Sequence, residues 1–355
     1  MTREPLAAEL IRKALEPGLF SLREIDFRGD GSKISFIPYP QGDGASRTAH
    51  HQPSHGDFPL GIFCCKDLLL MGAHAIVATP DHHFLREQNA ETILEQSIGI
   101  SSRGAKEGNP LLSSAVSLVS AASYNFYHWI IDSLPKVIVA EACGFSGTYL
   151  VPPPGVNPIV LESLAILGIE ENRIFPMEYE AVNVQELWIP THYHGHLMEA
   201  TPELHAAFRE RMLLGASKIS VPRKERLYIR RQASRKFRII ENADEVQALL
   251  SEFYFETFEM ERMTLREQIA LASQAACLIG PHGAGMLHSI WIPGGSKVIE
   301  ILPITYASTV MAVHSRILKH SYVPLLVPSE DPEMRMTVDC AVLRGELERV
   351  LGKAN

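Results

Sequence analysis

The sequence predicts an α/β protein made of two domains that face each other across a cleft. The chain has 355 residues, which suits about two domains of roughly 100–200 residues each better than one core. Apolar residues make up 46% of the chain and charged residues 21%, as in globular proteins. From about Glu225 to Pro303, strand-like and helix-like segments alternate. This alternation is typical of parallel β/α units in a doubly wound sheet.

The first half of the chain has a less regular pattern. Its opening segment, MTREPLAAELIRKALEPG, has the spacing of an amphipathic helix, whereas residues 40–57 have no period and are expected to form a loop. SYNFYHWIIDSLPKV (123–137) is predicted to be helical. An α/β unit is then expected from about 145 to 191, and it consists of TYLVPP (148–153), PIVLESLAILGI (158–169) and VQELWIP (184–190). We expect the domain boundary near 197–222.

The second half can be divided into elements with little ambiguity. Strands are predicted at RLYIR (226–230), FYFETFEM (253–260), ACLIG (276–280) and SKVIEIL (296–302). Helices are predicted at NADEVQALLSEF (242–253), TLREQIALASQA (264–275) and AGMLHSIWI (284–292). Thr264 and Glu267 have the spacing of a reciprocal capping box, which marks a helix start.

Charge and cysteine content narrow the functional classes. A net charge of −8 argues against a general nucleic-acid binder, but it permits one local basic pocket for a small anion. The five cysteines form no CxxC pair, which favours a reducing compartment. No apolar run approaches the roughly 18 residues of a membrane span. We therefore expect a cytoplasmic protein, whose amphipathic N-terminal helix could touch a membrane surface.

A glycine-rich turn, LIGPHGAG, follows the strand predicted at 276–280. Ligands of parallel sheets bind at the carboxyl ends of strands, where such turns lead into helices. Gly283 and Gly285 would let the backbone approach a ligand closely, and the amides of 283–286 would favour an anion. His282 could add a hydrogen-bond donor. A plain glycine turn with a capping histidine is the alternative interpretation.

A basic stretch, YIRRQASRKFR (228–238), begins at the end of another predicted strand of the same sheet. It holds five cations among eleven residues of an otherwise acidic chain. Arginine suits phosphate because its guanidinium donates two parallel hydrogen bonds. Arg230 and Arg231 should project to opposite faces, so only one should reach the site. A solvated basic loop is the alternative, but the neighbouring glycine turn favours a diphosphate.

The segment 123–137 offers a candidate general base. On a helix, His128 and Asp132 stand four residues apart on one face, and a carboxylate beside an imidazole orients its ring. Tyr124, Asn125 and Tyr127 suggest a polar aromatic surface of the kind that binds sugars. The alternative is a core helix in which His128 satisfies a buried backbone group.

Two further groups of histidines are candidate metal ligands. HYHGH places His192, His194 and His196 on one face of an extended strand, but no clear carboxylate or thiolate accompanies them, so we expect no metal there. A group in the loop is expected to be solvated: His50, His51 and His55. Neither a GxSxG nor a P-loop pattern is present.

Three stretches in this order resemble glycosyltransferase family 61, the DUF563-type transferases: NFYHWIIDSLPKV, YIRRQASRKFRIIENADEV and GPHGAGMLHSIWIPGGSKVIEI. The resemblance implies a GT-B architecture with two facing Rossmann-like domains. Residues 1–200 would form the acceptor side. Residues 201–355 would bind the nucleotide-sugar donor, with a last helix able to pack back on the first domain.

The resemblance also implies roles for single residues. Asn125, His128 and Asp132 match the acceptor-side motif and are the catalytic candidates. The donor-binding candidates are Arg231, Arg238, Glu245, His282, Gly283, Ala284, Gly285, His288 and Glu300. The sequence departs from the family pattern at His288, where asparagine is expected, at Arg230, where serine is commoner, and in the order Glu241-Asn242.

The implied reaction is an inverting glycosyl transfer that needs no cofactor and no essential metal. The donor is expected to be UDP-linked and the acceptor a glycan hydroxyl, in the synthesis of a bacterial surface polysaccharide. One alternative is a catalytically silent protein that binds a sugar nucleotide or a glycan. Another is a nucleotide-cofactor oxidoreductase, which the absence of GxGxxG spacing in the glycine turn disfavours.

Overall fold

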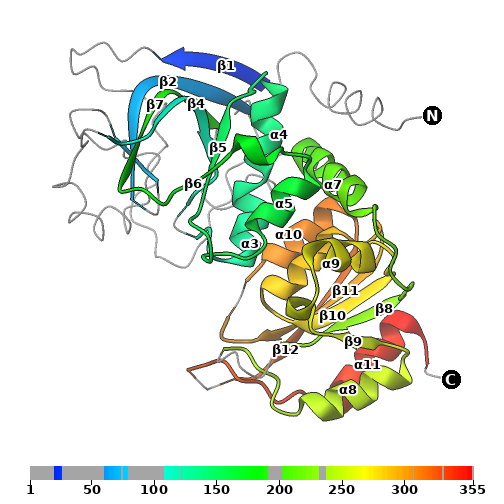
Figure 1. Cartoon of the computed structure of the whole chain (residues 1–355). Coiled ribbons are helices and arrows are strands. Elements are labelled where there is room, and N and C mark those ends of the chain that lie inside the picture. The colour runs from blue at the N-terminus through cyan, green and yellow to red at the C-terminus, as the bar shows by residue number, and fades with distance from the viewer. Residues whose placement is uncertain are drawn as a thin grey trace, which may run out of the picture.

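The computed structural model describes residues 20–25, 60–72, 75–78, 108–120, 122–190, 202–231, 237–306, 308–329 and 332–353. Within them, two β-sheets and their helices form an α/β fold, as the sequence predicts (Figure 1). Several expectations fall outside the described residues: the helix at 1–18, the loop at 40–57 with its histidines, the centre of the basic stretch at 232–236, and His192, His194 and His196.

The second half of the chain forms a parallel sheet of five described strands. These are β8 (Arg226–Ile229), β9 (Glu256–Phe258), β10 (Cys277–Pro281), β11 (Lys297–Pro303) and β12 (Ser321–Val327). The order across the sheet is β9-β8-β10-β11-β12, and every neighbouring pair is parallel. The strand order therefore reverses between β8 and β10. The carboxyl ends at such a switch point are the usual ligand-binding position of an open α/β sheet.

The strands predicted in this half are confirmed with shifted ends. The strand expected at 253–260 is reduced to β9 because Phe253 ends the preceding helix and Tyr254 has a positive φ of 61°. Strand β12, which contains Pro324, was not predicted. A proline is tolerated there because β12 lies at the edge of the sheet.

The described helices of this half are α8 (Ala243–Glu252), α9 (Leu265–Ala272), α10 (Val310–Ile317) and α11 (Cys340–Leu351), with short 3₁₀ segments η5 (Met260–Arg262) and η6 (Ala284–Ile290). The predicted capping box of Thr264 and Glu267 opens α9. The helix expected at 284–292 is the 3₁₀ segment η6 instead. Gly285, a poor α-helix former, lies in its first turn.

The last helix, α11, was expected to be able to pack back on the first half. Among the described residues, its buried apolar contacts lie within the second half. It packs against α8, and its Leu343 and Leu347 join a core with Val246 and Leu249 of that helix. Figure 1 shows α11 beside α8 in the second half.

The sheet of the first half is mixed. Its described strands are β1 (Phe20–Ile25), β2 (Leu60–Met71), β3 (Ile76–Ala78), β4 (Leu111–Ser117), β5 (Thr148–Val151), β6 (Ile174–Pro176) and β7 (Ala181–Pro190). The order is β1-β2-β7-β4-β5-β6, and β3 pairs with β2. The unit predicted at 145–191 is confirmed, with parallel β4, β5, β6 and β7. Because β2 runs antiparallel to β7 and β3, this sheet differs from a wholly parallel Rossmann sheet.

The described helical segments of the first half lie on the side that faces the second half (Figure 1). They are α3 (Phe126–His128), the π-helical segment η3 (Trp129–Ser133), α4 (Pro135–Ala142), α5 (Val160–Ile166) and the 3₁₀ segment η4 (Glu171–Arg173). Helix α7 (Pro202–Ala216) follows in the segment between the halves. None of the helices in the described part of the chain is long and apolar enough to cross a bilayer.

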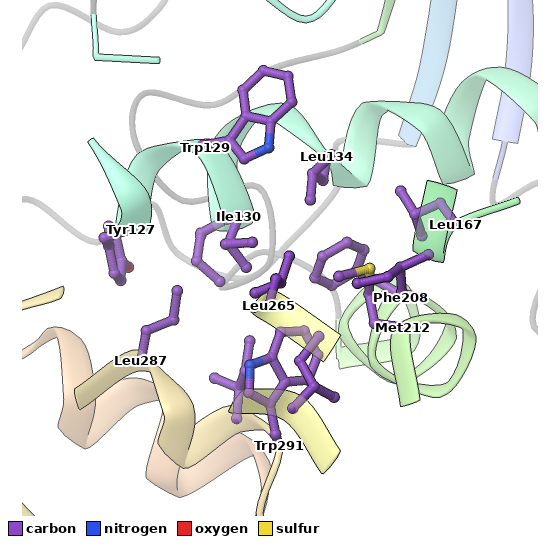
Figure 2. Close-up of a cluster of buried hydrophobic side chains, with 14 of the residues drawn as sticks. Tyr127, Trp129, Ile130, Leu134, Leu167, Phe208, Met212, Leu265, Leu287 and Trp291 are labelled. Atoms are coloured by element: carbon purple, nitrogen blue, oxygen red, sulfur yellow. The ribbon is translucent and has the colours of Figure 1, made fainter. Parts of the chain in front are cut away.

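Helices from both halves share one hydrophobic core. Figure 2 shows Trp129, Ile130 and Leu134 of the first half opposite Leu265, Leu287 and Trp291 of the second half. Phe208 and Met212 of α7, which lies in the segment expected to link the domains, fill the same core. The chain segment at the predicted boundary is therefore part of the interface between the halves.

Two polar side chains also join the halves. The carboxylate of Glu162 in α5 accepts hydrogen bonds from the first two amides of α9, on Leu265 at 2.9 Å and on Arg266 at 3.0 Å. Arg209 of α7 donates to the carbonyls of Ile290 at 2.6 Å and Ile292 at 2.8 Å, at the end of η6. Both contacts satisfy helix-terminal groups that have no partner within their own helix.

Candidate active site

The switch point of the second sheet brings two of the sequence motifs together. Arg231 lies two residues beyond the end of β8, and His282 follows β10 directly. Nη1 of Arg231 donates a hydrogen bond to the carbonyl of His282 at 3.3 Å. The basic stretch and the glycine turn therefore meet at the carboxyl edge of β8 and β10, as the sequence predicts.

The two neighbouring arginines have different partners. Arg230 donates to Gln247 Oε1 at 2.9 Å and to Asp244 Oδ1 at 3.0 Å, so its side chain lies on α8. Arg231 instead contacts the glycine turn. The two side chains therefore diverge, and Arg231 is the one that contacts the glycine turn.

The glycines of the turn allow this close approach. A Cβ atom on Gly283 would collide with Nη1 of Arg231, and the φ of 157° at Gly283 is one that other residues rarely adopt. A Cβ atom on Gly285 would lie 3.0 Å from Cγ2 of Ile229 in β8. Ala284, between them, packs against the core shared by both halves. Because η6 is a short 3₁₀ segment, its terminus offers a weaker anion site than the α-helix that the sequence suggested.

His282 belongs to a buried hydrogen-bond network. Its Nδ1 lies 2.6 Å from Oε1 of Glu300, a carboxylate of β11 that is 0% exposed. The other oxygen, Oε2, accepts a hydrogen bond from the Tyr322 hydroxyl at 2.6 Å. A buried carboxylate needs such donors to offset the loss of water. Tyr322 was not among the predicted site residues, because it lies on the unpredicted strand β12.

Arg238 reaches the same network from its outer side. Its guanidinium lies 5.0 Å from the ring centre of Tyr306, and that ring is 5.0 Å from the ring of His282. Tyr306 is 40% exposed and was not predicted as a site residue. Its position three residues beyond the end of β11 is the sequence signal that could have indicated it. Arg238 is therefore brought into the neighbourhood of His282, as expected.

The third motif forms a histidine–carboxylate pair at the start of the first helical segment. Nδ1 of His128 lies 2.7 Å from Oδ2 of Asp132, and the His128 side chain is 37% exposed while Asp132 is buried. Asn125 is the N-cap of α3, and its side-chain oxygen accepts from the amide of Tyr127 at 2.9 Å. With a proton on Nδ1 shared with Asp132, Nε2 of His128 is the nitrogen that can accept a proton.

The helix that holds this pair contains a π-helical segment, which was not predicted. The amide of Leu134 bonds to the carbonyl of Trp129 at 3.0 Å, five residues back. Pro135 follows directly, and its lack of an amide hydrogen removes one α-helical hydrogen bond. Such π-helical turns within helices often occur at functional sites.

Lys136 extends the row of His128 and Asp132 by one turn. Burial lowers the pKa of Lys136 to about 8, and the negative charge of Asp132 acts in the opposite direction. The four-residue spacing from Asp132 could have indicated this lysine, although it was not singled out from the sequence. The helix therefore carries a histidine, a carboxylate and a lysine in succession.

The first and third motifs meet through aromatic contacts. The ring of Phe126 lies 5.5 Å from the ring of His288 in η6, so α3 packs on the segment that follows the glycine turn. His288 is 1% exposed, and burial lowers its pKa to about 4. His288 therefore stands beneath the turn as a neutral core residue, rather than at the surface where a donor would bind.

The expected polar aromatic surface is only partly present. Tyr124 is 66% exposed, but Tyr127 is buried, and its hydroxyl lies 3.1 Å from Nε2 of His314 in α10. The ring of His314 lies 5.8 Å from that of the buried His205 of α7. Tyr127 therefore joins the interface between the halves, since its ring completes the packing of α3 there.

Glu245, one of the predicted donor-binding residues, has its described hydrogen-bond partner outside the network around His282. Oε2 of Glu245 accepts a hydrogen bond from Asn242 at 3.1 Å, next to the start of α8. Asn242 also donates to the carbonyl of Val338 at 2.9 Å. These contacts hold the segment before α11 against α8, and none of the described partners of Glu245 belongs to the network around His282. Among the described residues, no group of three or more histidine, cysteine, aspartate or glutamate residues could hold a metal ion.

The comparisons with known proteins identify the family. A family model described as Glycosyltransferase 61 matches residues 126–299, a range that contains His128, Asp132, Arg231 and His282. No curated protein matches the chain. A glycosyltransferase takes a sugar from a donor and passes it to an acceptor, which suits two separate groups of polar residues. Residues 126–299 therefore form a glycosyltransferase family 61 domain, and the protein is a glycosyltransferase.

Proposed function

We propose that the protein transfers a sugar, with inversion at the anomeric carbon, from a nucleotide-sugar donor to a hydroxyl of a glycan acceptor. The observation that carries this proposal is the convergence of the three motifs: Arg231 bonds to the carbonyl of His282, and α3 packs on η6. We further propose a UDP-linked donor, an acceptor from a bacterial surface polysaccharide, and a reaction in the cytoplasm without cofactor or essential metal.

The donor would bind at the carboxyl edge of the second sheet. Arg231 supplies a guanidinium and His282 an imidazole beside the glycine turn, and both can donate hydrogen bonds to a diphosphate. Arg238, stacked on Tyr306, would add positive charge at the outer side. In this proposal residues 201–355 form the donor domain and residues 1–200 the acceptor domain of a GT-B arrangement.

The acceptor would be activated by His128. Its Nδ1 is engaged by Asp132, and none of the described residues pairs with Nε2. Nε2 can therefore take the proton from an acceptor hydroxyl, while the carboxylate of Asp132 stabilises the imidazolium that forms. Asn125 fixes the start of the helix that positions His128. Lys136 balances the negative charge of Asp132.

The reaction would be a single displacement. The acceptor oxygen forms a bond to the anomeric carbon as the bond between that carbon and the diphosphate oxygen breaks. The proton of the acceptor hydroxyl moves to Nε2 of His128, and the electron pair of the broken bond stays with the diphosphate. Attack from the face opposite the leaving group inverts the anomeric carbon. Arg231 and His282 offset the charge that develops on the departing diphosphate.

Separate measurements of donor binding and turnover test these roles. His128→Ala should lower turnover at least about a hundredfold, the usual contribution of a general base, and leave donor affinity within about threefold. Arg231→Ala should weaken donor binding and lower turnover by about a hundred- to thousandfold. Arg230→Ala is the matched control, because the neighbouring arginine lies on α8 and should leave both values unchanged.

Two results would contradict the assignment. A loss of donor affinity in His128→Ala would place this histidine on the donor side. Unchanged turnover in the same variant would mean that the base lies elsewhere. Nucleotide binding without turnover by the unmodified protein, across a panel of glycan acceptors, would favour the silent binding protein instead.

A further inference from the structure

Three adjacent strands of the second sheet contribute one residue each to a continuous hydrogen-bond chain. His282 follows β10, Glu300 lies in β11 and Tyr322 in β12. The Tyr322 hydroxyl donates to Oε2 of Glu300 at 2.6 Å, and Oε1 of Glu300 lies 2.6 Å from Nδ1 of His282. This series of hydrogen bonds ends at the glycine turn, where Arg231 bonds to the backbone of His282.

We propose that Tyr322 is a positioning residue that acts through Glu300 to fix the proton of His282 on Nδ1. This inference rests on the proposed function, because His282 is there assigned to the donor diphosphate. Tyr322 itself belongs to neither the matched range nor any of the predicted motifs.

The hydrogen bond from Tyr322 matters because the carboxylate of Glu300 is buried. The carboxylate is 0% exposed, so water cannot replace a missing donor. Its described side-chain partners are one nitrogen of His282 and the hydroxyl of Tyr322. Without the hydroxyl, Oε2 would be a buried acceptor with no partner, which is costly for a charged group. Protonation of Glu300 would relieve that cost, but a protonated carboxyl no longer requires the proton of His282 on Nδ1.

The location of this proton decides what His282 can offer the ligand. With Nδ1–H directed at Glu300, Nε2 is the remaining nitrogen, and none of the described residues pairs with it. A doubly protonated His282 ring would donate its Nδ1–H to the carboxylate of Glu300 and its Nε2–H to a bound diphosphate. The charged N–H on the Nε2 side would then face the oxygen on which negative charge develops during transfer.

Packing makes the tyrosine a rigid support. The ring of Tyr322 packs against the core shared by the two halves, while its hydroxyl reaches Glu300. Burial and the neighbouring Glu300 both raise the pKa of Tyr322, so the hydroxyl stays a donor throughout the usual pH range. A change of Tyr322 to phenylalanine keeps the ring in place and removes only this hydroxyl.

The test compares Tyr322→Phe with the unmodified protein. Histidine labelled with ¹⁵N reports whether Nδ1 or Nε2 of His282 carries the proton, and the His282→Asn variant identifies its signals. We expect a protonated Nδ1 in the unmodified protein and a shift of the proton toward Nε2 in Tyr322→Phe. Turnover with saturating donor should fall about tenfold, with a smaller change in KM for the donor.

The matched control is Tyr149→Phe, which removes the hydroxyl of a buried tyrosine in β5 of the other sheet. It should leave the His282 signals unchanged and turnover within about twofold. Glu300→Gln provides a second route, because it keeps the size of the side chain but removes the charge that holds the Nδ1 proton. It should move the same signals even if Tyr322→Phe folds poorly.

The outcomes separate this inference from the proposed function. Unchanged His282 signals and turnover in Tyr322→Phe would overturn the role of the tyrosine while the donor site stands. If the unmodified protein binds no sugar nucleotide, the proposed function fails. The labelling experiment on the ligand-free protein then still decides whether Tyr322 controls the proton on His282.

Discussion

Substitution of Gly283 by alanine tests how closely the glycine turn and the arginine depend on each other. The new Cβ atom would collide with Nη1 of Arg231, so the guanidinium would have to move away from the carbonyl of His282. The backbone at Gly283, with a φ of 157°, would also be strained by any side chain. The change adds a single methyl group and removes no charge.

Gly283→Ala should change both the free energy of unfolding and the affinity for the donor. A residue other than glycine in this backbone region costs about 1–3 kcal/mol of stability. A displaced guanidinium would no longer reach the diphosphate, and a hydrogen bond to a charged group is worth about 1.5–3 kcal/mol. We therefore expect donor affinity to fall by about 10- to 100-fold.

Urea unfolding and calorimetric titration with the nucleoside diphosphate measure the two parts separately. Gly345→Ala is the control, because this glycine lies inside α11, where a Cβ atom meets nothing within 4 Å. That change should raise the free energy of unfolding by about 0.5–1 kcal/mol and leave donor binding unchanged. Normal donor affinity in a folded Gly283→Ala protein would refute the proposed contact between the turn, Arg231 and the diphosphate.

Two further predictions concern the interface between the halves. Glu162→Ala should lower the free energy of unfolding by about 1–3 kcal/mol, because two amides of α9 lose their acceptor. Urea unfolding measures this loss, with the exposed Glu178→Ala as the control. Equal stability of the two variants would contradict the prediction. Burial, with a smaller contribution from Arg209, lowers the pKa of His205 to about 4, and burial lowers that of His288 to about 4. Both folded-state values lie below the ordinary value of about 6.5, so the neutral forms stabilise the protein at higher pH and stability is lost as pH falls from about 6.5 toward 4. His205→Gln should reduce this slope in unfolding curves recorded at several pH values, and an unchanged slope would mean that His205 does not titrate on unfolding.

The regular part of the chain could be predicted from the sequence because local signals and tertiary structure agree there. Strands β8, β10 and β11 are short apolar runs, and the Thr264–Glu267 capping box marks the start of α9 correctly. The His128–Asp132 pair followed from helical spacing alone, since even the π-helical segment keeps the two side chains on one face.

The remaining features depend on contacts between distant parts of the chain. The position of Tyr322 depends on the pairing of β12 with β11, and no local sequence pattern predicts this pairing. His288 and Tyr127 were expected near the ligand, but the packing of α3 on η6 buries both. Glu245 has the right residue type near the right sheet edge, yet its carboxylate is directed to Asn242.

The central claim is that Arg231 and His282 form the binding site for a donor diphosphate. Its most direct test is a thermal-shift screen of nucleoside diphosphates and their sugar conjugates, with and without EDTA, on the unmodified protein and on Arg231→Ala. A ligand at a hundred times its dissociation constant should stabilise the protein by about 2.7 kcal/mol. We predict a selective stabilisation that resists EDTA and disappears in Arg231→Ala. If no nucleotide stabilises the unmodified protein, or if the shift survives in Arg231→Ala, the proposed donor site is wrong.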